Sequence, residues 1–329
     1  MEVSLSDQRS LISSSSYMNH KHDETMNNMI FACFVAGQKD IPKAMILAES
    51  IRTFAGDFSV APIWLMIPQE SKQPSKKVRI KIDALGIKLH PFEIDDQAAG
   101  FPFAGKVVAS AVAESLAVEQ ATQLVWMDTL AMVINSPDEL LLNRGVLLAC
   151  RPVDHILIGS PYEKPLDPFW DSVYQSCGVK EDDIFPMITS ADQVRIRPYI
   201  NAGMLVVRPE RKLLQLWCDT FLDIFQDSRY LELYEGKRIY KIFIHQAVFS
   251  ASVIASINQT EIMQLPYLVN YPLHMHSQYP ADRRPKSMNE LISFRYEGFF
   301  SKPNWRDIIR VEPPLVDWLA ERESILARR

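Results

Sequence analysis

Leu124-Val125-Trp126-Met127-Asp128-Thr129-Leu130 is the stretch that decides the fold of this chain of 329 residues. Four apolar residues, enough for a buried strand, stop at the carboxylate of Asp128. An apolar strand that ends in an acid places that side chain at the carboxyl edge of a sheet, where many α/β proteins bind ligands. The stretch therefore predicts a sheet with an acid facing a ligand at its edge.

The residues before Asp128 alternate between the patterns of strands and helices. Short apolar runs have the length of strands, and between them apolar residues recur at helical spacing. The expected strands are residues 29–35, 62–67 and 87–92, and the expected helices are residues 42–51, 75–85 and 104–118. This rhythm predicts an α/β fold, a mixed and mostly parallel sheet with helices on both faces.

After Asp128 the rhythm loosens. The sequence predicts strands at residues 147–150, 156–159 and 199–207, and helices at residues 209–225, 239–254 and 315–326. Because no internal repeat or linker interrupts the chain, we expect one domain over residues 28–329 with an elaborated C-terminal half. The polar, serine-rich residues 1–27 predict a flexible tail, since they contain too little apolar surface to pack.

The composition excludes several classes of function. Hydrophobic residues make up 47% of the chain and charged residues 23%, which is typical of a soluble globular protein. The net charge of -5 argues against a nucleic-acid-binding surface. No apolar run reaches the ~18–20 residues of a membrane span, and the four cysteines are too far apart for a zinc or redox pair, so we expect a cytoplasmic protein. The 11 glycines form neither a dinucleotide fingerprint nor a phosphate-binding P-loop.

Several stretches, in the same order along the chain, resemble nucleotide-sugar glycosyltransferases of the GT-A type and their GT8-like branch. Residues 125–128 are similar to the family's Leu-Trp-Leu-Asp strand, and residues 199–207 resemble its Asn-Ala-Gly segment. Residues 294–305 are similar to its C-terminal His-Tyr-x-Gly-x-x-Lys-Pro-Trp. The resemblance implies a GT-A-like fold and the transfer of a sugar from a nucleotide diphosphate sugar to an acceptor hydroxyl.

The resemblance also implies a set of site residues. The catalytic candidates are Asp128, Asn201 and His245. The donor-binding candidates are Ala36, Gly37, Lys106, Asp128, Gly203, Gln246, Arg295, Lys302 and Trp305. The implied partners are a nucleotide-sugar donor and an acceptor that the sequence does not identify.

The same side chains have structural interpretations that the sequence leaves open. Asp128 could pair with Lys106 instead of contacting a ligand, and Asn201 and Gly203 could form a tight turn. His245 could act as a general base, because the free imidazole titrates near neutral pH. It lies on an otherwise apolar helix, however, where a hydrogen-bonded core histidine is an equal expectation.

The chain departs from the family pattern where a metal ion is expected. Leu130 replaces the second acid of Asp-x-Asp, His245 replaces a common acid before Gln246, and Arg295 stands where a metal-ligating histidine is expected. A Mg²⁺ or Mn²⁺ ion requires several hard oxygen ligands, so Asp128 is not sufficient.

Two substitutes for the missing ligands are possible. His274 and His276 would lie on one side of an extended segment and could complete a metal site with Asp128. A basic set could instead neutralise the diphosphate without metal: Arg283, Arg284, Lys286, Arg295 and Lys302. Metal-dependent and metal-independent transfer are equally open. The missing acids also fit a degenerate GT-A fold that binds a nucleotide or a partner as a scaffold.

Overall fold

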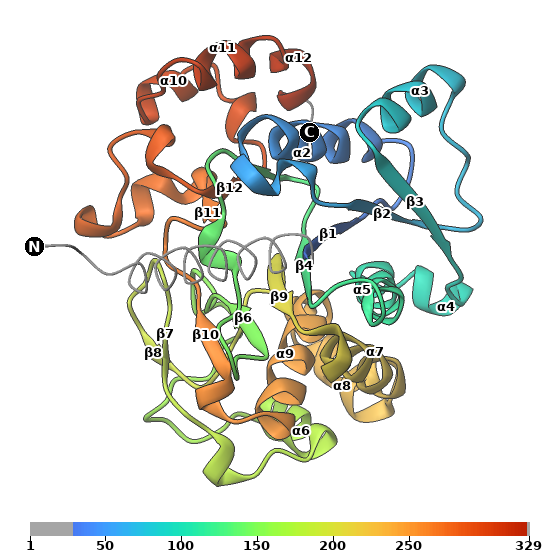
Figure 1. Cartoon of the computed structure of the whole chain (residues 1–329). Helices are drawn as coiled ribbons and strands as arrows, with labels where there is room; N and C mark the ends of the chain where they lie inside the picture. The colour runs from blue at the N-terminus through green and yellow to red at the C-terminus, as the bar shows by residue number, and fades with distance from the viewer. Residues whose placement is uncertain (1–28, 328–329) are drawn as a thin grey trace, which may run out of the picture.

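The strand that ends at Asp128 lies in the middle of a seven-stranded sheet. The computed structural model describes residues 29–327, so the predicted tail at residues 1–27 lies outside the described residues. The strand order is β10-β6-β9-β4-β1-β2-β3 (Figure 1). The strands are β1 (Met29–Phe34), β2 (Ile63–Pro68), β3 (Ile87–Phe92), β4 (Gln123–Met127), β6 (Leu148–Cys150), β9 (Met204–Val207) and β10 (Ile262–Gln264).

The sheet is mixed and mostly parallel, as the sequence predicted. Strands β1, β2, β3 and β4 pair in parallel, as do β6 and β10, whereas β9 runs antiparallel to both of its neighbours, β4 and β6. Because β9 is antiparallel, its beginning lies beside the end of β4. The backbone N–H of Asp128 donates to the carbonyl of Gly203 at 2.9 Å. Two segments separated in sequence therefore meet at one edge.

Helices cover both faces of the sheet because side chains alternate along each strand. Ile30 and Ala32 of β1 face a core that includes α5 (Ala104–Ala117), α6 (Pro168–Cys177), α7 (Leu213–Ile224) and α9 (Arg238–Ser256). Phe31 and Cys33 face the other core, which includes α2 (Ile41–Phe54) and Ile82 of α3 (Lys76–Ala84). The short helices α4 (Asp96–Ala99) and α8 (Ser228–Gly236) complete this part of the fold. Four tryptophans expected in the core are buried: Trp64, Trp126, Trp170 and Trp217.

The C-terminal half adds a small second sheet and its own core. Strand β5 (Ala131–Val133) follows Asp128 and pairs with β12 (Ser293–Arg295), which also pairs with β11 (Tyr271–Pro272). Helices α10 (Trp305–Ile308), α11 (Leu315–Ala320) and α12 (Glu323–Leu326) pack beside this sheet (Figure 1). This arrangement brings Arg295 back toward the end of β4.

Three local predictions are corrected by the structure. Residues 156–159 form a turn instead of a strand, and residues 199–203 are a loop that precedes β9. The last expected helix is broken into α11 and α12. Tertiary contacts at these short segments override weak local preferences.

Helix α9 has 19 residues, and an apolar window of 18 residues within it has a mean hydropathy of 1.3, which meets the length and composition criteria for a membrane span. No membrane span was expected from the sequence, but this one helix is long and apolar enough to count as a candidate. In the structure, 67% of its apolar window is buried against other parts of the chain. A core helix meets the same criteria, so the finding is weak evidence for a membrane segment.

Candidate active site

A cavity of about 570 Å³ opens at the edge of the sheet where β1 and β4 end and β9 begins. Eight of the predicted site residues line it: Ala36, Lys106, Asp128, Asn201, Gly203, His245, Gln246 and Arg295. Gly37, Lys302 and Trp305, which were predicted to bind the donor, and His274 and His276, which were predicted to bind metal, do not line it. The topology thus brings together residues from six separate parts of the chain.

Asp128 and Lys106 form an ion pair at the bottom of this cavity. The Nζ atom of Lys106 lies 2.6 Å from Oδ1 of Asp128. Lys106 is buried in the first turn of α5, whereas the Asp128 side chain keeps 37% of its surface exposed. The ion pair leaves Oδ2 available, so the pairing and ligand-binding interpretations of Asp128 are compatible.

Gly203 allows the backbone to approach Asp128 closely. A Cβ atom at this position would lie 2.9 Å from Oδ2 of Asp128 and 2.8 Å from Oδ1 of Asn201. The same Asn201 oxygen accepts the backbone N–H of Gly203 at 2.8 Å. Asn201 therefore forms the tight turn with its carbonyl oxygen and lines the cavity at the same time.

Arg295 is held in a buried network that was not predicted. Its Nη2 lies 2.5 Å from Oδ2 of Asp154, and its Nη1 lies 2.6 Å from Oε1 of Glu297. The hydroxyl of Tyr279 donates to Oδ1 of Asp154 at 2.6 Å. Burial by itself would raise the pKa of Asp154, but the guanidiniums of Arg295 and Arg151 hold that pKa below its ordinary value. Asp154 is therefore a charged carboxylate that fixes Arg295 in place.

The sequence contained a signal for this network. Arg151 directly follows β6, as Asp128 directly follows β4, and Asp154 lies close behind it. Applying the strand-end argument to β6 would have identified both Arg151 and Asp154 as candidates. Their partner Arg295 lies 141 residues from Asp154, and no local pattern connects them.

His245 lies in the cavity wall as a neutral imidazole. Only 3% of the residue is exposed, and its ring stacks on Phe103 with centroids 4.4 Å apart. Its Nδ1 is 3.0 Å from the carbonyl of Ile242, a geometry in which Nδ1–H donates. Burial, with a smaller effect of Lys106, lowers the pKa of His245 to about 3. An imidazole this weakly basic is poorly matched to general-base catalysis near neutral pH.

The histidines predicted to bind metal do not face Asp128. They lie on a 3₁₀ helix, Leu273–Gln278, so the expected alternation of an extended segment is wrong. Nε2 of His274 is 3.5 Å from a carboxylate oxygen of Glu297, and Nδ1 of His276 is 3.0 Å from the hydroxyl of Tyr271. Within residues 29–327, no group of three or more His, Cys, Asp and Glu side chains is arranged to hold a metal ion.

The donor set near Asp128 does not suit Mg²⁺ or Mn²⁺. Such ions require several oxygen ligands, but one oxygen of Asp128 already accepts from an ammonium group and Leu130 supplies none. The nearest cations, Lys106 and Arg295, would repel a divalent ion.

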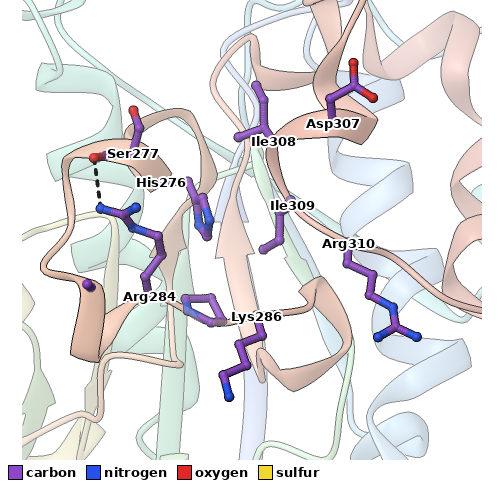
Figure 2. A pocket seen from close by; sticks show the side chains of 10 residues that line it. His276, Ser277, Arg284, Lys286, Asp307, Ile308, Ile309 and Arg310 are labelled. Atoms are coloured by element: carbon purple, nitrogen blue, oxygen red, sulfur yellow. Dashed lines mark hydrogen bonds between the residues drawn. The ribbon is translucent and has the colours of Figure 1, made fainter.

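The predicted basic set is divided between separate sites. Arg284 and Lys286 line a hollow of about 670 Å³ in the C-terminal part, which shares no lining residue with the cavity described above. Figure 2 shows their side chains together with Arg310. Nη2 of Arg284 donates there to the carbonyl of Ser277 at 3.1 Å. Arg283 lines a third hollow. Only Arg295 of this set reaches the cavity.

Trp305 and Lys302 also need correction as donor-binding residues. Trp305 is 2% exposed and packs against Phe299 and Phe300 in the C-terminal core, so no ligand can stack on it. Lys302 is exposed and lies 5.8 Å above the ring of Phe299. The polar sequence around Trp305 concealed its apolar partners.

A further hollow, of about 500 Å³, adjoins the active-site cavity, and Phe34 and Ala36 line both. It lies where β2 and β3 end, and its polar lining comes from Gln69, Glu70, Ser71, Glu93 and Asp96. The two hollows form one depression along the carboxyl ends of the parallel strands, where open α/β sheets bind ligands.

One protein-family model matches the part of the chain that contains most residues of this site. The family model described as a Rhodobacterales glycosyltransferase domain matches residues 32–241, well over half of the chain. The matched range contains Lys106, Asp128, Asp154 and Asn201, whereas Arg295 lies beyond it. No curated protein matches the sequence.

Solved structures with similar folds are distant in sequence. The galactosyltransferase LgtC in complex with donor and acceptor sugar analogues is 16% identical, with a TM-score of 0.44, and the match covers 91% of this chain and 94% of that chain. Mouse xyloside xylosyltransferase 1 in its apo form is 10% identical, with a TM-score of 0.40, and the match covers 82% of this chain and 96% of that chain.

Proposed function

We propose that this chain, which belongs to the Rhodobacterales glycosyltransferase domain family, transfers a sugar from a nucleotide diphosphate sugar to an acceptor hydroxyl without a divalent cation. The observation that carries the proposal is the pair of Lys106 and Asp128, 2.6 Å apart at the cavity floor. It puts a buried ammonium group where a metal-dependent enzyme would need further oxygen ligands.

The two hollows, of about 500 and 570 Å³, share Phe34 and Ala36 in their linings and would together hold a nucleotide sugar. The nucleoside would occupy the polar hollow at the ends of β2 and β3, and the diphosphate would follow past Phe34 to the start of α5. The N-terminus of this 14-residue helix carries a partial positive charge, which favours an anion. The sugar would then reach the cavity floor.

Lys106 and Arg295 would stabilise the negative charge of the departing diphosphate. Both are ion-paired in the free protein, but each retains donors, since an ammonium group has three N–H bonds and a guanidinium five. Nε of Arg295 is buried without a hydrogen-bond partner among the described residues. Donors that are already fixed in place need no reorganisation when charge develops.

Asp128 and Asn201 would orient the transferred sugar. Oδ2 of the partly exposed Asp128 side chain could accept from sugar hydroxyls while Lys106 pairs with Oδ1. The neutral imidazole of His245 can accept a hydrogen bond but does not titrate near pH 7. We infer a positioning role for it.

A scaffold that binds without turnover is the less favoured alternative. Burying the charge of a lysine costs free energy unless the charge is fully paired or has a function. A site that no longer catalyses a reaction would not need to keep the buried Lys106 beside the partly exposed Asp128. In this proposal, Lys106 and Arg295 would take the place of the acids whose absence suggested a scaffold.

The proposal is tested by nucleotide release and sugar transfer with UDP-, GDP-, ADP- and dTDP-sugars, each in EDTA and in Mn²⁺. We expect at least one donor to raise the melting temperature and to turn over in EDTA. Turnover that appears only with Mn²⁺ would refute metal independence. An absence of binding and turnover in both conditions would favour the scaffold.

Two substitutions and one control complete the test. Asp128→Asn and Lys106→Met should each lower kcat/KM by about 10²–10³-fold, the usual effect of removing a preorganised charge. Asp138→Asn is the matched control, because Asp138 is exposed and does not line the cavity. Equal activity of all three variants would mean that the pair has no part in transfer.

A further inference from the structure

The outer wall of the active-site cavity is apolar, in contrast to its charged floor. Phe103, Leu157, Phe243 and Met275 line the cavity together with the ionised groups at its floor. Phe103 is 46% exposed and Leu157 is 54% exposed, so both present apolar surface to solvent at the entrance. Large apolar side chains exposed together beside a ligand site indicate that something apolar covers them.

Leu157 is held rigidly despite its exposure. It lies in a turn whose first residue, Ile156, donates its N–H to Oδ2 of Asp192 at 2.8 Å. The turn closes through a hydrogen bond from Gly159 N–H to the Ile156 carbonyl. A Cβ atom on Gly159 would lie 3.2 Å from the ring of Tyr199, so the turn is pressed against the core. Leu157 is therefore a fixed part of the wall.

Phe103 is fixed in a comparable way. Its ring stacks on the buried imidazole of His245, 4.4 Å away and tilted by 21°. Both Phe103 (φ 63°) and Leu157 (φ 42°) have left-handed backbone conformations, which are unfavourable for bulky side chains. Strained residues of this kind concentrate at ligand-binding sites. The unfavourable backbone conformation there holds a side chain in a position that a relaxed conformation would not give it.

The position of this wall identifies the ligand it would contact. The adjoining polar hollow, with Glu70, Glu93 and Asp96, lies at the opposite side of Phe34 and suits a hydrophilic nucleoside. A donor bound there, as proposed above, would place its sugar near Lys106 and Asp128. With the donor in this position, the apolar wall would be left free to contact the acceptor.

We propose that the acceptor carries its reactive hydroxyl next to an apolar group, such as an alkyl or aryl aglycone, which packs against Phe103 and Leu157. The proposal rests on the proposed sugar transfer and adds the class of acceptor. A wholly hydrophilic acceptor would leave these two side chains in water and gain nothing from the strain that positions them.

The test compares glycosides that differ only in the aglycone. Binding of methyl and octyl β-glucopyranoside, and of the corresponding galactopyranosides, to the full chain is measured by calorimetry below the concentration at which octyl glycosides form micelles. The measurement is made with and without a donor nucleotide. We expect at least one octyl glycoside to bind about tenfold or more tightly than its methyl counterpart, a difference of about 1.4 kcal/mol.

Two variants show whether the wall is responsible. Leu157→Asn and Phe103→Asn should abolish the octyl preference, and both should fold, because asparagine tolerates the left-handed conformation. Leu231→Asn is the control: Leu231 is 46% exposed on α8, outside the cavity, and this variant should keep the preference.

Two outcomes would overturn the proposal. One is equal binding, or no binding, of methyl and octyl glycosides by the unmodified protein. The other is an octyl preference that persists in both cavity variants. Donor turnover in EDTA is measured independently of these titrations, so sugar transfer can be supported while the apolar acceptor is refuted.

Discussion

Glu114 should make the folded protein less stable as the pH rises toward 7. It lies on α5 with no exposed surface, and its Oε2 accepts the backbone N–H of Gln215 at 2.8 Å. Burial raises the pKa of Glu114 from 4.5 to about 7, although backbone N–H groups at the start of α7 oppose the shift. The folded chain therefore binds a proton between pH 4.5 and 7 that the unfolded chain releases. Stability is fully present below pH 4.5 and declines above it.

The magnitude follows from the difference of about 2.5 pH units between the two pKa values. At about 1.4 kcal/mol per unit, the free energy of unfolding should fall by about 3 kcal/mol between pH 4.5 and pH values above 7. Glu114→Gln removes this titration and keeps an oxygen to accept from Gln215. Its amide group lacks a partner, which costs about 1–3 kcal/mol at every pH.

The assay is urea unfolding of the wild type, Glu114→Gln and Glu119→Gln at pH 5, 6, 7 and 8. The control residue, Glu119, is exposed near the end of the same helix. The wild type and the control should lose stability relative to Glu114→Gln as the pH rises. Parallel curves for all three proteins would show that Glu114 is ionised with an ordinary pKa, and the argument from burial would be refuted.

Three further substitutions test other parts of the site. Gly203→Ala should lower sugar transfer by about 10²-fold, because the new Cβ would displace the Asp128 carboxylate, whose Oδ2 would be 2.9 Å away; transfer equal to that of the wild type would contradict this. His245 has a pKa lowered to about 3, so the unfolded chain binds a proton between pH 3 and 6.5 that the folded chain does not. The free energy of unfolding should fall as the pH drops through this window, and it should fall less in His245→Gln. If urea unfolding shows the same loss between pH 7 and pH 5 in the wild type and the variant, this prediction is refuted. Arg295→Met should lower the free energy of unfolding by about 3–5 kcal/mol, because it removes a cation from the buried Asp154; an unchanged melting temperature would rule this out.

The sequence was sufficient for features that depend on neighbouring residues. Helical and strand periodicities are local, so the strands β1 to β4, the main helices between them and the position of Asp128 at the edge of the sheet could be predicted. The buried tryptophans followed from the same patterns. The short segments after β4 could not be assigned reliably, because their conformations depend on contacts with distant parts of the chain.

Individual site residues were harder to predict than the edge of the sheet that carries them. Lys106 was expected near Asp128, and the fold confirms their pairing. Trp305 was expected to be accessible because its neighbours in sequence are polar, but aromatic side chains of the C-terminal core enclose it. His274 and His276 were expected on one side of a strand, but a 3₁₀ helix directs them to different partners.

The sequence by itself determined the alternation of strands and helices and the acid at the end of β4, since both are encoded over a few consecutive residues. Only the tertiary structure decided the charges around that acid. It joined Arg295 to Asp154 across 141 residues and placed Gly203 against Asp128. It also put Phe103 and Leu157 on one wall. The physical reason is that ion pairing, close packing and strain act through space, whereas sequence periodicity reports only which face of its own element a residue occupies.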